Sequence, residues 1–148
     1  MSQLRAVTIG LVDPKDPSHV QRAILSIGQA LPLPTLRVTI VAAAEDASSV
    51  RRITMRVIDR AGTARPGRYR LRVWIAATAF GAPGGTQVIA VVPGTTLLQT
   101  IASNQDLSLL TDPSGTAQLD VTVSGPGTRH VMADVAGEVV TSGAVAWT

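Results

Sequence analysis

The fold is decided by an eight-residue stretch near the middle of the chain, Arg68-Tyr69-Arg70-Leu71-Arg72-Val73-Trp74-Ile75. Apolar and basic residues alternate along most of it, and successive side chains of a β-strand point to opposite faces. We therefore predict a strand over 68–78 that buries its apolar side chains and exposes its arginines. Residues 52–60 repeat the alternation, and Ile53, Met55 and Val57 are predicted to point inward.

Short strands separated by turn residues fill the chain on both sides of this stretch. Further strands are predicted at 36–44, 88–92, 96–101, 107–110, 117–123, 130–135 and 139–147. Glycine and proline mark the connections, as in 112–115 and 125–127, because they supply the backbone angles that turns need. Many short strands at a spacing of roughly 8–12 residues are typical of an all-β sandwich or barrel. The sequence therefore predicts an all-β fold.

The first 34 residues differ from the rest, and two interpretations of them stay open. Asp16 and Pro17 fit the N-cap and first position of a helix. Four apolar residues fall at helical spacing: Val20, Ile24, Ile27 and Leu31. These side chains could cover an edge or end of the same sandwich, or lie on a partner as part of an extended arm. We assign 1–34 to an N-terminal arm or short helical segment and 35–148 to one β-sandwich domain.

Composition excludes several classes of function. The 148 residues include no cysteine, which rules out disulfides, zinc–thiolate sites and thiol catalysis. Only 3% are aromatic, which disfavours a surface that stacks bases or sugars. No apolar run approaches the ~20 residues that span a bilayer. The N-terminus has no basic region followed by an apolar stretch, so we expect no secretion signal.

No residue pattern points to catalysis or to a metal. His19 and His130 are the only histidines, and they are far apart in sequence. Ser114 and Ser124 sit in predicted turns rather than in the strand–turn–helix setting of a catalytic serine. Asp112 is best explained as a turn former whose carboxylate binds nearby backbone amides. We therefore expect no enzymatic activity, no cofactor and no metal site.

The feature with the most functional promise is a cluster of arginines. Eight arginines fall within residues 51–72, where Asp59 is the only acid. Period-two geometry places six of them on two strand faces: Arg52, Arg56 and Arg60 on one, and Arg68, Arg70 and Arg72 on the other. The planar guanidinium suits paired hydrogen bonds to carboxylates or phosphates. The cluster is either a solvated outer face or a contact surface for an acidic partner. Nucleic acid is a weaker candidate, because the net charge is only +3.

Charge is distributed unevenly between the two halves of the chain. Residues 1–74 hold twelve basic residues against five acidic ones, whereas residues 75–148 hold Arg129 against five acidic ones. Such asymmetry supports contacts either between subunits or between the two sheets of one subunit.

A motif in the second half of the chain carries a family resemblance. Its residues are Thr111-Asp112, Gly115, Ala117, Leu119, Val121, Val123, Gly127, Val131, Ala133, Val135 and Gly137. This stretch, 110–137, resembles the back half of bacterial immunoglobulin-like domains of the invasin and intimin type. Segments similar to 67–74, with an aromatic near the end such as Trp147, occur in structural proteins of tailed phages. The resemblance covers about residues 36–148 and implies an immunoglobulin-like β-sandwich.

The resemblance implies a structural role in a bacteriophage particle. We expect a capsid decoration or cement protein on the outer surface of the virion. It would bind the major capsid protein, or another virion protein, through residues 1–34 and the arginines. Self-association is also expected, with trimers suggested by analogy, and no membrane is involved. Two alternatives stay open: a tail, baseplate or fibre component, or an adhesin-like module whose loops at 80–85 and 125–127 contact a host ligand.

Overall fold

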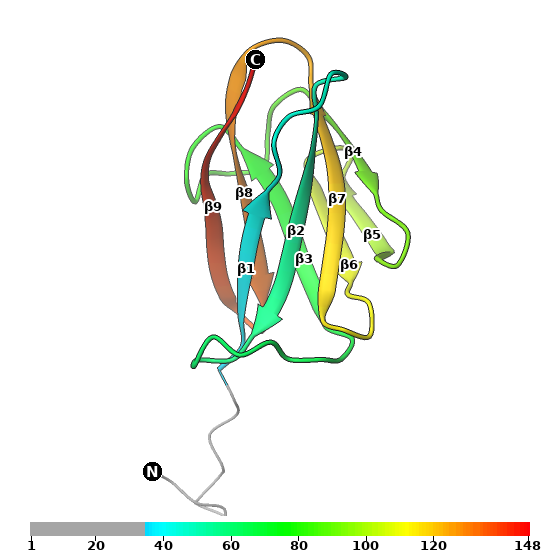
Figure 1. Cartoon of the computed structure of the whole chain (residues 1–148). Coiled ribbons are helices and arrows are strands. Elements are labelled where there is room, and N and C mark those ends of the chain that lie inside the picture. Colours follow the sequence, from blue (N-terminus) through cyan, green and yellow to red (C-terminus); the bar gives the residue numbers. More distant parts are fainter. Residues whose placement is uncertain (1–34) are drawn as a thin grey trace, which may run out of the picture. The chain divides into compact units, whose positions relative to one another are not determined.

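The computed structural model describes residues 35–148, which form two antiparallel β-sheets packed face to face (Figure 1). The strands are β1 (Arg37–Ala42), β2 (Val50–Ile58), β3 (Arg70–Ala76), β4 (Gln87–Val91), β5 (Thr96–Ala102), β6 (Asp106–Leu110), β7 (Thr116–Val123), β8 (Gly127–Val135) and β9 (Glu138–Trp147). One sheet has the order β1-β2-β7-β4 and the other the order β5-β6-β3-β8-β9. The predicted β-sandwich is confirmed. The predicted N-terminal arm or helix, with Val20, Ile24, Ile27 and Leu31, lies outside the described residues.

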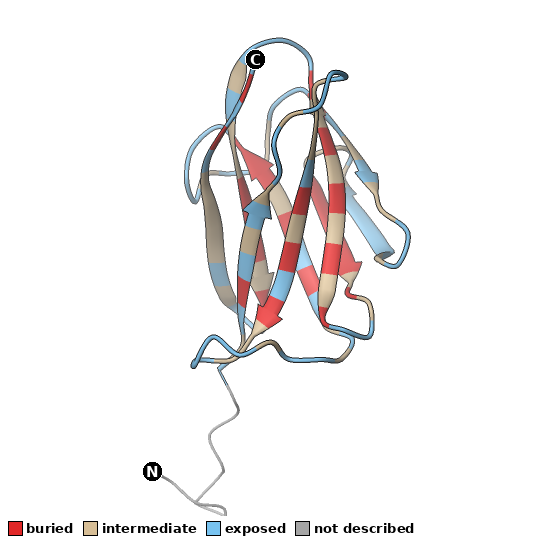
Figure 2. Ribbon diagram, viewed as in Figure 1, coloured by how far each residue is buried: buried red, intermediate tan, exposed pale blue. Residues whose placement is uncertain are grey.

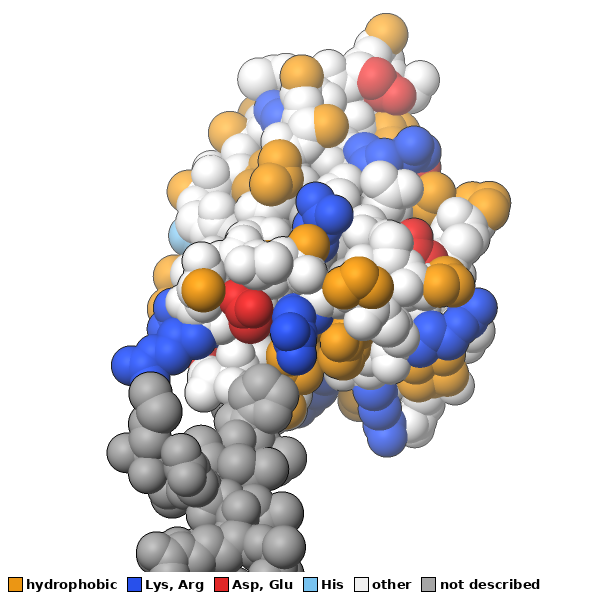
Figure 3. All heavy atoms as spheres, turned by 60° about the horizontal axis from the view of Figure 1, so that its bottom comes forward, with side chains coloured by type: hydrophobic (Ala, Val, Ile, Leu, Met, Phe, Trp, Pro, Cys, Tyr) orange, Lys and Arg blue, Asp and Glu red, His pale blue; other side chains and the backbone are white. Residues whose placement is uncertain are grey.

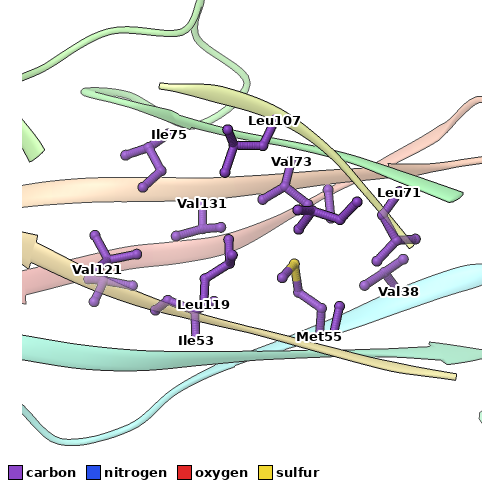
Figure 4. Close-up of a cluster of buried hydrophobic side chains, with 14 of the residues drawn as sticks. Val38, Ile53, Met55, Leu71, Val73, Ile75, Leu107, Leu119, Val121 and Val131 are labelled. Carbon is purple, nitrogen blue, oxygen red and sulfur yellow. The ribbon is translucent and has the colours of Figure 1, made fainter. Parts of the chain in front are cut away.

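The core lies between the two sheets and follows the predicted alternation. Ile53, Met55 and Val57 of β2 have no exposed surface, and Leu71 and Ile75 of β3 are likewise fully buried. Figure 2 shows buried positions alternating with more exposed ones along these strands, and Figure 4 shows the side chains of both sheets meeting in one cluster. Burying a side chain of this size contributes about 1.5–3 kcal/mol, so the cluster dominates the stability of the domain.

The two arginine-bearing strands are central strands of different sheets. β2 pairs with β1 and β7, whereas β3 pairs with β6 and β8. The like charges that would face one another if β2 and β3 were neighbours are therefore kept apart by the core. Tyr69, which alternation places on the same side as Leu71, precedes β3, is only half-buried and packs at the margin of the core.

Two turns show how short sequence signals fix the connections. The Asp112 carboxylate accepts hydrogen bonds from the backbone amides of Ser114, at 2.8 Å, and Thr116, at 3.0 Å, which confirms its predicted role. Between β8 and β9, Ala136 and Gly137 have φ angles of +53° and +87°. Positive φ at both central residues is what a tight two-residue hairpin requires.

The last strand is anchored in the sandwich through its final residues. Trp147 is buried, with 2% of its surface exposed, and the Arg51 guanidinium lies 5.6 Å from the centre of its ring. The Glu45 carboxylate accepts hydrogen bonds from both the backbone amide and the hydroxyl of Thr148. Since Glu45 follows β1 and Thr148 follows β9, these contacts join the edges of the two sheets on one side.

Candidate binding surface at the basic end of the sandwich

The six predicted arginines are divided by the fold into three groups. Arg52 and Arg56 lie on the outer face of the four-stranded sheet, because their neighbours Ile53, Met55 and Val57 point into the core. Arg70 and Arg72 lie on the outer face of the five-stranded sheet. Arg60 and Arg68 lie in the connection between β2 and β3 and are exposed. The arginines therefore do not form the single face that a shared sheet would have given.

Arg52 is paired within the domain. Its guanidinium donates two parallel hydrogen bonds of 2.9 Å to the two oxygens of Asp120, which lies opposite it on β7. Hydrogen bonding by Arg52, assisted by its positive charge, lowers the pKa of the Asp120 carboxyl group. The same contact raises the pKa of Arg52. This pair joins the basic first half of the chain to the acidic second half.

Arg72 is paired too, and with a more deeply buried partner. Its guanidinium lies 2.7 Å from the Asp106 carboxylate, whose side chain is only 3% exposed. The guanidinium also lies over the Trp74 ring, at 5.3 Å from the ring centre. Hydrogen bonding to Asp106 raises the pKa of Arg72, with a smaller electrostatic contribution from Asp134. A buried carboxylate needs such a partner, so Arg72 is required by the fold itself.

A second group of arginines lacks such partners. We call their location the basic end: the β2–β3 connection (59–69), the β6–β7 turn (111–115) and Arg56 at the adjoining part of β2. Within residues 35–148, no carboxylate lies within 4.0 Å of the guanidinium of Arg56, Arg60 or Arg68. Figure 3 shows the molecule with this end turned towards the reader. Basic side chains are spread across it, with few acidic ones.

The backbone of the basic end is held by specific hydrogen bonds. The buried Thr111 hydroxyl accepts from the Tyr69 amide at 2.9 Å and donates to the Gly67 carbonyl at 3.0 Å. Gly115 has a φ of +82°, and a Cβ atom there would come within 2.2 Å of the Arg65 carbonyl oxygen. Only glycine permits this close approach between the β6–β7 turn and the β2–β3 connection.

Two acidic residues at the basic end mainly organise its turns. The Asp59 carboxylate accepts hydrogen bonds of 2.9 Å from the amides of Ala61 and Thr63, and reaches Arg65 only at 4.0 Å. The hydroxyl of Ser114, together with the amide of Thr116, lowers the pKa of Asp112. These carboxylates bind the backbone more closely than the arginines, so much of the positive charge stays available to a partner.

The opposite end of the sandwich carries a different kind of surface. The loop between β3 and β4 (77–86) contains no charged residue, and the Phe80 side chain is 63% exposed at a φ of +56°. The Arg129 side chain lies beside Gly85, because a Cβ on Gly85 would contact its guanidinium. Gln87, just after this loop, pairs with Val123, just before the turn at 125–127, so the two connections are at the same end of the sandwich. The sequence indicated these loops, but gave no sign of the positive φ.

A depression on the outer face of the five-stranded sheet was not predicted. It has a volume of about 350 Å³. It is lined by Arg70, Arg72, Ile101, Ser108, Asp134, Ala136 and Gly137. These residues come from β3, β5, β6, β8 and the β8–β9 turn, so only the strand order brings them together. Alternation could have placed Arg70 and Arg72 on this face, but not Ile101 beside them.

Within 35–148, no three histidine, aspartate or glutamate side chains are grouped closely enough to hold a metal ion. Ser114 donates its hydroxyl hydrogen bond to Asp112 as part of the turn. That part of the chain also has no helix long and apolar enough to cross a membrane.

Comparisons with known proteins bear on the fold. No protein-family model matches the sequence, and no curated protein matches it. The structure is similar to the D00–D0 domain of intimin, with a TM-score of 0.50 and 20% identity over 82% of this chain. The chain spans 50% of that intimin structure. A chitin-binding domain of a chitinase from Pyrococcus furiosus superposes over 75% of this chain and 98% of its own, at 13% identity. Its TM-score of 0.34 is too low to indicate a shared fold.

The likeness to intimin agrees with the family resemblance of the sequence. It supports an immunoglobulin-like β-sandwich fold. At 20% identity it concerns the fold alone, and this fold carries many functions.

Proposed function

We propose that this chain is a non-enzymatic binding module that attaches to an acidic protein surface through its basic end. The observation that carries the proposal is the division among the arginines. Arg52 and Arg72 are used inside the domain, whereas within residues 35–148 no carboxylate lies within 4.0 Å of the guanidinium of Arg56, Arg60 or Arg68. The charge of Arg68 contributes only the last of the effects that lower the pKa of Asp112. Guanidinium groups displayed in this way suit carboxylates on a partner.

Attachment relies on noncovalent contacts and involves no chemical reaction. The hydrogen bonds of Thr111 and the close packing at Gly115 hold the basic end before a partner arrives. A surface that is already ordered loses less conformational entropy on binding. Complementary charge speeds the encounter and fixes its orientation, and many modest contacts together resist separation.

The setting that we propose is the outer surface of a bacteriophage capsid. There the chain acts as a decoration or cement protein on the major capsid protein, or on another virion protein, and associates with itself. Support comes from the resemblance of residues 67–74, with the Thr-Asp turn motif and Trp147 near the end, to structural proteins of tailed phages. Residues 1–34, with their apolar side chains, are proposed to add to the contact with the shell.

The copy number of the chain in purified virus particles from its native source tests this setting. Quantitative mass spectrometry should find as many copies as of the major shell protein, or a simple fraction of that number. A handful of copies per particle would indicate a tail, baseplate or fibre component instead. Absence of the chain from particles would overturn the virion proposal.

An adhesin-like module is a second candidate function, and one observation favours it. The loop at 77–86 carries no charge, its Gly85 lies beside Arg129 at the same end of the sandwich as the turn at 125–127, and its Phe80 is 63% exposed. Under this proposal a Phe80→Asn variant loses binding to a host ligand, while an Arg60→Ser/Arg68→Ser variant keeps it. The capsid proposal expects the reverse for binding to particles.

A further inference from the structure

The depression on the outer face of the five-stranded sheet owes its shape to side chains of unequal length. Ser108 of β6, Arg72 of β3 and Asp134 of β8 lie opposite one another across three neighbouring strands. Ser108 is short and only 1% exposed, so it forms a floor beside the long side chains of Arg70 and Arg72. The volume of about 350 Å³ lies at the lower end of the range for ligand sites, which is roughly 300–1,000 Å³.

Arg70 is held in a fixed orientation at this depression. Its Nε–H donates to the hydroxyl of the buried Ser108 at 3.0 Å. Within residues 35–148, no carboxylate lies within 4.0 Å of its guanidinium, and no hydrogen bond involves its two terminal nitrogens. Arg72 differs, because Asp106 already occupies its Nε–H and one terminal nitrogen. Arg70 therefore presents an oriented guanidinium to a carboxylate from outside the domain.

Asp134 adds a hydrogen-bond acceptor to the same lining. Its Oδ1 atom accepts from the Gly137 amide at 2.9 Å, which holds the carboxylate beside the β8–β9 turn. Among the described residues, no hydrogen bond reaches its other oxygen. This carboxylate repels a bare anion but accepts from an N–H group. The lining therefore favours a carboxylate that arrives together with an N–H donor, as it does in a peptide.

The depression adjoins the basic end. Arg70 follows Arg68 by two residues and lies opposite Leu110, directly before the β6–β7 turn. An acidic partner that is attracted to the basic end therefore meets the depression as a neighbouring contact. Ile101 on its wall is 48% exposed and offers apolar surface to the methylene groups of a long polar side chain.

We propose that the depression binds one acidic side chain of the protein partner and thereby fixes the position of that partner. The carboxylate contacts the terminal nitrogens of Arg70 and the hydroxyl of Ser108, and a backbone N–H of the same segment donates to Asp134. Glutamate suits the site better than aspartate, because its two methylene groups can lie against Ile101. This inference rests on the proposed function, since it names the feature of the acidic partner that the chain recognises.

An NMR titration of the full chain with a short peptide tests the proposal without the native partner. The probe is an acetylated and amidated Gly-Glu-Gly tripeptide, and the Arg side-chain Nε–H signals report where it binds. The Gly-Gln-Gly peptide lacks only the charge, and propionate carries a carboxylate without an amide. Arg70→Lys keeps the positive charge but removes the planar fork.

Arg56→Lys is the matched control. Arg56 also has no carboxylate within 4.0 Å among residues 35–148, but it lies on the other sheet. Both variants keep the net charge of the chain, so long-range attraction is the same in both. Circular dichroism verifies that each variant is folded.

The Glu peptide should shift the Arg70 Nε–H signal to saturation and bind roughly fivefold or more tightly than the Gln peptide or propionate. Arg70→Lys should lose roughly the same factor in affinity, whereas Arg56→Lys binds like the wild-type chain. Equal shifts at all exposed arginines, equal binding of propionate, or an unchanged affinity in Arg70→Lys would overturn the proposal.

Failure of this inference can be told apart from failure of the proposed function. Binding of the chain to native particles through Arg60 and Arg68 is a separate measurement, and it can succeed although the peptide does not bind. Conversely, a chain that binds the peptide at Arg70 but does not bind particles would contradict the proposed function and leave the depression as a carboxylate site.

Discussion

The two ends of the sandwich show how one scaffold presents two unlike surfaces. The basic end displays Arg60 and Arg68 on a backbone held by Thr111 and Gly115. The other end displays an uncharged loop with a strained, exposed Phe80. The same strands connect both ends. For example, β3 begins at Arg70 near the basic end and finishes at Ala76, just before the uncharged loop. The difference lies mainly in the connections, which is where binding residues gather on rigid folds.

The arginines also differ in whether they pair with a carboxylate of the same domain. Arg52 and Arg72 each meet a carboxylate from the acidic second half of the chain. Part of the charge asymmetry in the sequence is therefore neutralised by ion pairs between neighbouring strands of the same sheet. Arg56, Arg60 and Arg68 at the basic end have no carboxylate within 4.0 Å among residues 35–148, so mutations of the two groups should have different consequences.

The largest effect is expected from distorting the basic end through Gly115→Ala. The new Cβ would lie 2.2 Å from the Arg65 carbonyl oxygen, and the alanine backbone would have to keep the positive φ of Gly115. Strain and overpacking together should lower the free energy of unfolding by about 3 kcal/mol. Gly94→Ala is the control, since Gly94 also has a positive φ but has open space around it. Urea unfolding measures both; equal losses would show that the packing against Arg65 does not matter.

Arg72→Ala should have the next largest effect. It leaves the Asp106 carboxylate buried without its partner, which costs about 2 kcal/mol of stability. Arg52→Ala should cost less, because both members of that pair are partly exposed to water. Replacing Asp106 by Ala together with Arg72 should restore part of the stability. If Arg52→Ala proved the more damaging change in urea unfolding, the distinction between the two pairs would be wrong.

Acid should weaken the domain through the two carboxyl groups that the fold stabilises in their charged form. The pKa values of Asp112 and Asp120 are lowered in the folded state. Their contribution is therefore fully present above the unfolded pKa of about 4 and is lost as the pH falls through the folded values. The urea midpoint should fall as the pH is lowered below 4, and Asp112→Asn should reduce that fall. An unchanged slope in Asp112→Asn would contradict the assignment.

The smallest effect is expected at the opposite end, and it has the opposite sign. Phe80→Asn should leave stability unchanged or raise it by up to about 1 kcal/mol, because asparagine tolerates the positive φ and no core contact is lost. Thermal unfolding measures the change. A clear loss of stability would mean that Phe80 supports the loop rather than being held out by it.

Sequence patterns predicted the parts of this structure that depend on local spacing. Alternation identified Ile53, Leu71 and the other inward residues, and Asp-Pro-Ser-Gly identified the turn at Asp112. Alternation does not predict which strands are neighbours, because the period of two describes side chains within one strand. Pairing of Arg52 with Asp120, 68 residues away, follows from the order of the sheet and could not be foreseen.

The unpredicted features of the candidate surfaces have a common cause. β5 contains two shifts of register against β6, which places Ile101 beside the depression although simple alternation gives no such position. The positive φ of Phe80 depends on the hydrogen bonds that fix its loop. Both depend on hydrogen bonds made in the folded structure, between β5 and β6 for Ile101 and with Thr78, Trp74 and Ile75 for the loop at Phe80, which alternation in a single sequence does not reveal.

The central claim is that the arginines of the basic end bind an acidic partner, and one measurement tests it most directly. Arg60→Ser/Arg68→Ser and Arg52→Ser/Arg129→Ser lower the net charge equally, but only the first pair lies at the basic end. Binding of each folded variant to stripped native particles should be measured over a series of salt concentrations. The account predicts that the first variant loses roughly tenfold or more in affinity and much of its salt dependence, while the second binds like the wild-type chain. Equal losses in both variants, or none in the first, would contradict it.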